Sequence, residues 1–341
     1  MKMLTKVVFL SCVLVVGCFN HQLANAQQRE TRPDQEPTLK IDTALVSVPV
    51  IVSDQQGRYI SGLKASDFSL YEDRVKQAID FFADTEEPIN VALLLDTSKS
   101  TTMVLDDIKN AAKDFVKQLR PQDRAMIVSF DFHETALCEL TSDRKTLEKA
   151  IGKARIGETV GTKLRDAVYD VMSEEFRAVK GRKAIILLTD GKDHGSDINE
   201  RILLDAATEA DTLIYSVFYR SLPPNFTRRG RGGWGRRGGI FTPLPPPRQQ
   251  RRRERMEERS ADAIEFLQQL SDVSAGRYFD SEVAKLKETF VQIVEELRHQ
   301  YRLGFYPSDH PAGSVHSLKV QVERSGVVVR SRRSYRVATK P

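Results

Sequence analysis

Apolar and polar residues follow two different periods along the chain from residue 89 to residue 219. Runs dominated by apolar residues are typical of strands buried on both faces, and they predict strands at 91–96, 124–130, 184–190 and 212–219. Elsewhere apolar residues recur every three or four positions, which predicts amphipathic helices. Strands that alternate with helices indicate a parallel or mostly parallel sheet with right-handed crossovers.

The helices implied by this pattern lie at 106–119, 143–153, 163–176, 197–210, 260–274 and 283–300. A further strand, 135–140, is expected beside 124–130. Together these elements predict an α/β domain over residues 89–300, a doubly wound, mostly parallel sheet with helices on both faces.

Shorter segments with a period of two flank this domain on both sides. Residues 43–53 place four valines on one face of a strand, and Pro49, which lacks a backbone donor, indicates an edge strand. Other strands are predicted at 68–71, 77–82, 301–306, 318–323 and 327–330. Residues 39–88 can bury little apolar surface alone. We therefore expect this N-terminal β-rich region to pack on the sheet or on the C-terminal β-strands of 301–341.

The first 26 residues are typical of an export signal. Lys2 and Lys6 precede an apolar run at 7–17 that is too short to span a bilayer comfortably. A cleavage site of small residues ends at Ala26. Cleavage there leaves a polar, disordered lead-in at 27–38 and predicts an exported protein, periplasmic or secreted.

The cysteines leave a second export route open. Val15-Val-Gly-Cys18 is similar to a lipoprotein processing site, which would leave a protein lipid-anchored at Cys18. After cleavage at Ala26 the one remaining cysteine is Cys138, so no intrachain disulfide can form. Its apolar-polar surroundings favour a buried structural role.

The net charge of +5 is concentrated in one segment. Residues 220–259 contain twelve Arg against three Glu, and the export signal adds two Lys, so the rest of the chain carries a net charge of −6. Arg-Gly repeats and a proline run predict that 220–259 is a disordered insertion. In an exported protein this insertion could bind anionic lipid or another polyanion; nucleic acid is a less plausible partner. A solvated loop without a partner is the alternative.

Candidate chemistry lies where the predicted strands end. Asp96 directly follows an apolar run, with Ser98 and Ser100 behind it in an Asp-x-Ser-x-Ser pattern. Thr162 precedes a predicted helix, and Asp190 ends a second buried strand. Open α/β sheets bind ligands at the carboxyl ends of their strands, so two carboxylates and three hydroxyls can meet at one edge. Such an all-oxygen set suits a hard cation such as Mg²⁺.

This constellation resembles the metal-ion-dependent adhesion site of a von Willebrand factor A domain. The family motif, Asp-x-Ser-x-Ser with a distant Thr and a distant Asp-Gly, is matched in order by Asp96, Ser98, Ser100, Thr162 and Asp190. The segments DFSLYED and QYRLGFYPSD resemble the bacterial exported branch of the family, and this likeness covers about residues 39–335. The resemblance implies a Rossmann-like fold and a protein-binding module.

The charge of the predicted site indicates what it binds. Two carboxylates just neutralise one divalent cation, Mg²⁺ or otherwise Mn²⁺ or Ca²⁺, and the three hydroxyls are weak donors. The metal stays electropositive and holds a water that a carboxylate from a protein ligand can replace. Around these positions Asp131, Asp166, Asp193 and His194 are candidates for supporting contacts.

An enzyme is not expected, because the five motif positions offer no general base beyond the aspartates that bind the metal. The sequence contains no Gly-x-Ser-x-Gly elbow and no His-Glu-x-x-His helix, and no phosphate-binding glycine-rich loop joins a predicted strand directly to a helix. We therefore expect no small-molecule substrate. The alternative function is an envelope scaffold that the insertion at 220–259 tethers to anionic surfaces, with a vestigial metal site.

Overall fold

A computed structural model describes residues 45–84, 87–220 and 247–337, without the side chains of 247–257. These residues belong to one compact unit. The predicted export signal, the lead-in and residues 221–246 of the predicted insertion lie outside the described part.

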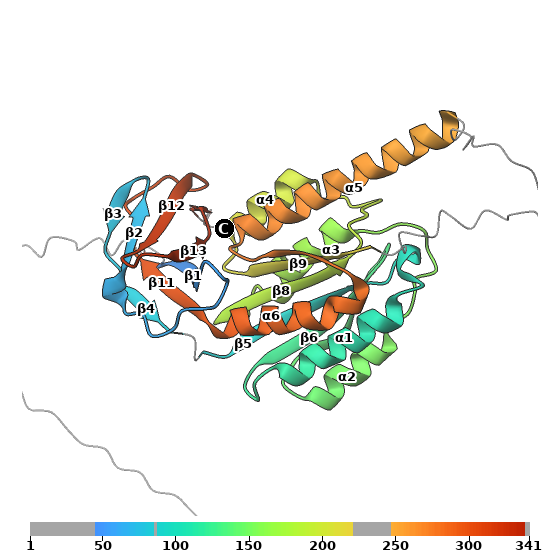
Figure 1. Cartoon of the computed structure of the whole chain (residues 1–341), viewed down its shortest axis with the longest axis horizontal. Coiled ribbons are helices and arrows are strands. Elements are labelled where there is room, and N and C mark those ends of the chain that lie inside the picture. Colours follow the sequence, from blue (N-terminus) through green and yellow to red (C-terminus); the bar gives the residue numbers. More distant parts are fainter. Residues whose placement is uncertain (1–44, 85–86, 221–246, 338–341) are drawn as a thin grey trace, which may run out of the picture. The chain divides into compact units, whose positions relative to one another are not determined.

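The centre of the fold is a six-stranded sheet in the order β10-β9-β8-β5-β6-β7 (Figure 1). Its strands are β5 (Ile89–Asp96), β6 (Arg124–Phe130), β7 (Glu134–Thr141), β8 (Arg182–Thr189), β9 (Leu213–Tyr219) and β10 (Tyr278–Ser281). All neighbours are parallel except β6 and β7. Every residue of β5 is buried, as its continuous apolar run predicts for a central strand.

Helices cover both faces of this sheet and confirm the predicted doubly wound α/β fold (Figure 1). One face packs against α1 (Leu105–Gln118), α2 (Arg144–Lys153) and α6 (Leu286–Arg298). The other face packs against α3 (Leu164–Asp170), α4 (Glu200–Glu209) and α5 (Pro247–Val273).

Two further sheets form a β-sandwich from both flanks of the chain. One has the order β13-β1-β11-β4 and the other β14-β12-β2-β3. Their strands are β1 (Val46–Asp54), β2 (Phe68–Glu72), β3 (Val75–Gln77), β4 (Phe81–Ala83), β11 (Gln300–Phe305), β12 (Val315–Val322), β13 (Val327–Ser331) and β14 (Ser334–Arg336). Apolar residues of both sheets share one core. The N-terminal region thus packs on the C-terminal strands, which was one of the two predicted arrangements.

The prediction that Pro49 marks an edge strand was wrong, because β1 lies between β11 and β13. Pro49 is opposite Arg302 of β11, whereas β13 starts to pair only at Val50. At Pro49 itself β1 therefore has a neighbour on one side only, and the missing backbone donor leaves no gap in the β13 ladder.

Three other predictions need correction. The predicted insertion is not disordered to residue 259, because α5 begins at Pro247; proline suits a first helical position, and the Arg, Gln, Glu and Met that follow favour a helix. The helix predicted to reach residue 176 ends at Asp170 and continues as a π-helical turn, Val171–Glu175. The strand predicted at 77–82 is divided between β3 and β4.

Charged side chains join the sandwich to the six-stranded sheet. Arg182, the first residue of β8, donates to the carbonyl of Glu87 at 3.0 Å and to Oε1 of Gln300 at 2.8 Å. Arg302 of β11 pairs with Asp211 at 2.9 Å. Arg182 lies at the amino end of its strand, so these contacts form at the edge opposite to the carboxyl ends of β5 and β8.

Candidate metal centre

Four of the five predicted site residues are buried at the carboxyl edge of the sheet. Asp96 is the last residue of β5, and Asp190 directly follows β8. Asp96 is 0% exposed, Ser98 3%, Thr162 4% and Asp190 7%. The fifth, Ser100, is half-buried in the turn that precedes α1. These side chains come from three loops, as the sequence predicts.

Asp96 accepts hydrogen bonds from Ser98 and Thr189 in this buried position. The backbone amide of Ser98 donates to Oδ1 at 3.0 Å, and the Thr189 hydroxyl donates to Oδ2 at 2.9 Å. Burial, and next the charge of Asp190, raise the pKa of Asp96 to about 6. These hydrogen bonds thus offset only part of the cost of a buried carboxylate, and a bound cation would offset more.

The two motif serines lie side by side. Oγ of Ser98 and Oγ of Ser100 are 3.0 Å apart. Thr101, which is fully buried, fixes this turn because its hydroxyl donates to the carbonyl of Ser98 at 2.8 Å. The Thr101 contact was not predicted, since it depends on the turn conformation and not on the spacing of the motif.

The loop that carries Thr162 is tied to its neighbours by backbone hydrogen bonds. Thr162 and His194 form an isolated antiparallel bridge, in which the His194 amide donates to the Thr162 carbonyl at 2.8 Å. Gly161 has a φ of +138°, and a Cβ at this position would lie 3.0 Å from the carbonyl oxygen of His194. Glycine thus allows the close approach that brings Thr162 to this edge.

Asp190 has a basic neighbour that sequence reasoning missed. The ammonium group of Lys192 contacts Oδ2 of Asp190, and the Lys192 amide donates to Oδ1 at 3.4 Å. Thr189, also missed, links the two acidic positions, since its hydroxyl accepts from the Gly191 amide at 2.9 Å while it donates to Asp96. In the sequence, the one indication that Thr189 and Lys192 contact the site was their position beside Asp190.

The four predicted supporting residues all hold loops, although the sequence could not assign their contacts. Asp131 accepts from the Thr97 hydroxyl at 3.4 Å. Asp166 accepts from the amides of Asp197 and Ile198, at 3.1 and 2.9 Å. Asp193 accepts from the Arg165 amide at 3.0 Å and from the Ser196 hydroxyl at 2.6 Å. His194 contributes its backbone, and its side chain is exposed.

The donor set fits a hard divalent cation. It consists of two carboxylates and three hydroxyls, all oxygen ligands of the kind that Mg²⁺, Mn²⁺ and Ca²⁺ prefer. Burial and the charge of Asp190, which raise the pKa of Asp96, make its ionised form costly, and a cation between the two carboxylates would lower that cost. Because hydroxyls add no charge, such a site would leave the ion partly electropositive.

Comparison with known proteins finds one matching family. The family description "von Willebrand factor type A domain" matches residues 90–221, which include all five candidate residues. No curated protein matches the chain. Similar solved structures include proximal thread matrix protein 1 from the mussel byssus, with 14% identity over 73% of this chain and a TM-score of 0.46. This chain covers about half of that protein, 50%.

Two bacterial structures are similar to comparable degrees. A von Willebrand factor type A protein from Catenulispora acidiphila has 12% identity, covers 80% of this chain and 74% of its own, and has a TM-score of 0.45. BatB from Bacteroides thetaiotaomicron has 16% identity and a TM-score of 0.41, and the match covers 61% of this chain and 98% of the BatB chain. The sequence match, the sheet order and the helices on both faces lead to one conclusion. Residues 90–221 of this chain are a von Willebrand factor type A domain.

Proposed function

We propose that this domain binds a divalent cation, Mg²⁺ in the first place, and through it a carboxylate of a protein partner. The observation that carries the proposal is the fully buried Asp96, which lies beside a second carboxylate and two paired serine hydroxyls. Asp96 and Asp190 would supply the charge, and Ser98, Ser100 and Thr162 the neutral donors. When bound, the ion supplies an open coordination position for an acidic ligand group.

The neighbouring carboxylates support binding and not catalysis. A hydrolase that uses a metal-bound water normally needs a general base within reach. Asp131, Asp166 and Asp193 each accept hydrogen bonds that hold the loops of the site. They are therefore committed to positioning, and we propose that this domain is an interaction module without catalytic activity.

We also propose an extracellular or envelope location. The basis is the sequence of residues 1–26, with its two lysines, apolar run and small-residue cleavage site. Among the described residues, no helix combines the length and the apolar character that crossing a membrane requires.

Metal binding is the first test. Titration of Mg²⁺ and Mn²⁺ into wild-type protein by calorimetry should show saturable binding that Asp96→Ala abolishes. Asp170→Ala, a carboxylate on α3 outside the candidate set, is the matched control and should bind like the wild type. Equal binding by wild type and Asp96→Ala would overturn the assignment of the site.

The partner test uses an envelope extract of the source cells. Immobilised wild-type protein should retain a partner in Mg²⁺, and should lose it in EDTA or with the Asp96→Ala variant. Blocking the carboxylates of the extract with a carbodiimide and an amine should also prevent retention. A partner retained equally under all of these conditions would contradict the carboxylate bridge.

A further inference from the structure

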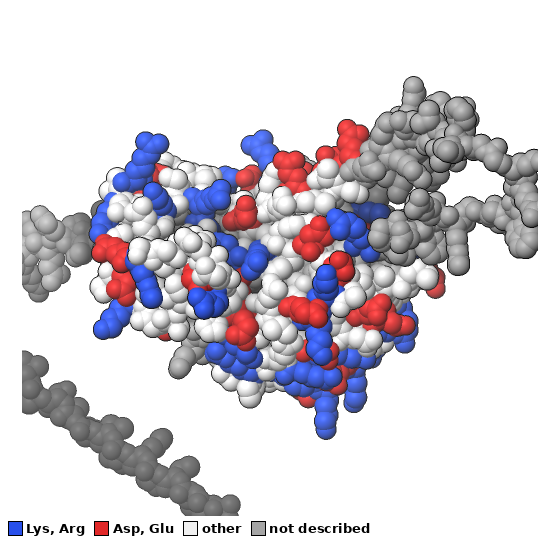
Figure 2. Space-filling model, in the orientation of Figure 1, with Lys and Arg blue, Asp and Glu red and all other residues white. Residues whose placement is uncertain are grey.

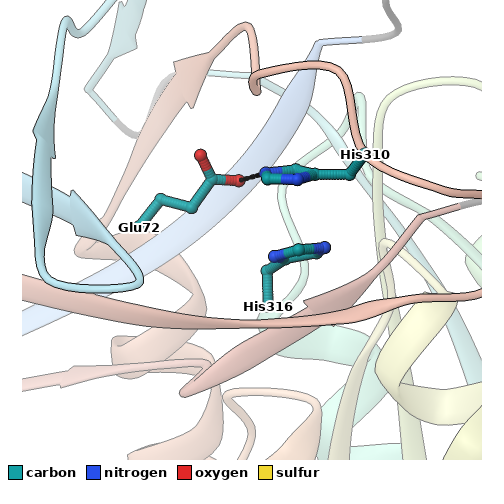
Figure 3. A group of neighbouring side chains, drawn as sticks. All are labelled: Glu72, His310 and His316. Atoms are coloured by element: carbon teal, nitrogen blue, oxygen red, sulfur yellow. Dashed lines mark hydrogen bonds and ion pairs between the residues drawn. The ribbon is translucent and has the colours of Figure 1, made fainter.

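A second group of metal-binding side chains lies in the β-sandwich, apart from the von Willebrand factor type A domain. It consists of Glu72 at the end of β2, His316 on β12, and His310 in the segment before β12 (Figure 3). One ligand atom from each lies within 4.8 Å of the other two. Nε2 of His310 is 3.2 Å from Oε1 of Glu72. Residues far apart in the sequence thus bring two imidazoles and one carboxylate together.

These three side chains are largely shielded from solvent. The Glu72 side chain is 3% exposed, that of His310 21% and that of His316 12%. The two imidazole rings are stacked with their centroids 3.6 Å apart and their planes 20° from parallel (Figure 3). Two stacked imidazoles beside a buried carboxylate form a nitrogen-rich group in the sandwich.

Other polar groups orient the three candidates. Oδ2 of Asp73 is 2.7 Å from Nδ1 of His316, while Oδ1 of Asp73 accepts from the amide and the hydroxyl of Ser317 at 2.9 Å. A carboxylate that holds one nitrogen of a histidine directs the other nitrogen towards a metal in many metal sites.

Glu72 is held in a similar way. The Tyr335 hydroxyl donates to Oε1 of Glu72, and the side-chain amide of Gln77 donates to Oε2 at 3.1 Å. Nε2 of His316 lies 2.7 Å from the hydroxyl of Ser314, a group that an ion could replace. The carboxylate is therefore fixed. To bind one ion together, the two stacked imidazole rings would have to turn out of their parallel arrangement so that a lone pair from each points to the same place.

We propose that Glu72, His310 and His316 bind a transition-metal ion of the Zn²⁺ type. Two imidazoles and a carboxylate suit Zn²⁺, whereas Mg²⁺ and Ca²⁺ prefer oxygen ligands. The ion would fasten the segment between β11 and β12 to the end of β2. The site has no residue in common with the candidate centre at Asp96, so either can fail without the other.

The test measures zinc binding in protein without a histidine tag, after treatment with EDTA. Asp96→Ala serves as the parent because it removes the other candidate cation site. The parent should bind one Zn²⁺, and adding His310→Gln and His316→Gln should abolish that binding. His133→Gln, which changes an exposed histidine elsewhere, is the control and should leave zinc binding unchanged.

Two further readouts keep the proposal testable if the double variant folds poorly. X-ray absorption by the zinc-loaded parent should show scattering from two imidazoles. Asp73→Asn retains all three ligands and should weaken zinc binding about 10- to 100-fold. Absence of imidazole scattering, or equal zinc binding by the parent and the His310→Gln, His316→Gln variant, would overturn the proposal and leave a metal-free hydrogen-bonded cluster.

Discussion

At the scale of single residues, the candidate centre depends on the electrostatic state of Asp96. Its carboxyl is fully buried and lies near Asp190, so the ionised form is costly in the metal-free protein. The same cost makes the site responsive to a cation and to protons. Divalent cations and protons should therefore compete for Asp96, and metal affinity should fall as the pH drops below about 6.

The stability of the metal-free protein should also depend on Asp96. The folded-state pKa is about 6 against 3.8 for the ordinary carboxyl, so the folded state binds the proton more tightly. This group therefore favours folding below pH 3.8, and the contribution is lost as the pH rises through 6. In urea unfolding with EDTA present, the free energy of unfolding of the wild type should fall between pH 5 and pH 7 by more than that of Asp96→Asn does. The difference between the two falls should be on the order of 1–3 kcal/mol. A difference between the two proteins that does not change with pH would contradict this prediction.

Lys192 should limit metal affinity. Its ammonium group contacts Oδ2 of Asp190 and supplies a positive charge that a divalent cation must share or displace. Lys192→Met should bind Mg²⁺ about threefold or more tightly than wild type in calorimetry. Lys149→Met, which removes the charge of an exposed lysine on α2, is the matched control. Weaker Mg²⁺ binding by Lys192→Met would show that the lysine supports the site instead.

At the scale of elements, the site depends on loops that α3 holds together. Asp166, in the first turn of α3, accepts from two amides of the loop that follows β8. Asp166→Ala should leave these amides without their partner and destabilise the protein by about 1–3 kcal/mol. Because this loop also bridges to Thr162, Mg²⁺ affinity should fall as well. Asp170→Ala on the same helix is the control, and it should change the urea midpoint and the Mg²⁺ affinity much less than Asp166→Ala does.

The elements that the sequence predicted well are those with local causes. The buried strand β5 and the helix α1 follow directly from the period of their apolar residues. The start of α5 was missed although its causes are local, because the Arg-rich composition before residue 259 was interpreted as disorder while the same residue types favour a helix. The π-helical turn after Asp170 has no signal in the period of the apolar residues.

Contacts between distant parts of the sequence escaped prediction for another reason. The five motif positions could be placed at one edge because parallel strands align their ends. The hydrogen bonds of Thr189 and Lys192 depend on loop conformation, which no spacing records. Glu72 and His310 meet only because β2 pairs with β12, and such long-range pairing leaves no local pattern.

At the scale of the whole molecule, Glu296 links α6 to the sandwich. This carboxylate is 0% exposed and pairs with Arg330 of β13 and, at 3.6 Å, with Arg277. Glu296→Gln leaves both guanidinium groups without their countercharge and should destabilise the protein by about 2–3 kcal/mol in urea unfolding. Glu295→Gln, the more exposed neighbour on the same helix, should cost less than about 0.5 kcal/mol. Equal effects of the two substitutions would contradict a structural role for the buried pair.

The Arg-rich segment is the second feature at this scale. On the face shown in Figure 2, Lys and Arg are interspersed with Asp and Glu, so this face has no large patch of positive charge alone. We propose that residues 221–246, with their Arg-Gly repeats, give the protein affinity for anionic surfaces. Deleting 221–246 should abolish salt-sensitive sedimentation with anionic vesicles. The deletion must end before Pro247, where α5 begins, because Leu267 and Leu270 of α5 belong to the core. Unchanged vesicle binding would sink this proposal.

The position of Arg182 has a consequence for the order of folding. Its guanidinium group holds Glu87, just before β5 begins, and Gln300, the first residue of β11. Strands β1 and β11 pair although most of the chain lies between them in sequence. While that long connection is unfolded, bringing the two strands together is entropically costly and slow. Once the domain has folded, Arg182 keeps Glu87 and Gln300 together and that cost falls. The sandwich should therefore assemble last. Until then, strands β1 to β4 expose unpaired backbone groups that can pair with other chains unless a chaperone covers them.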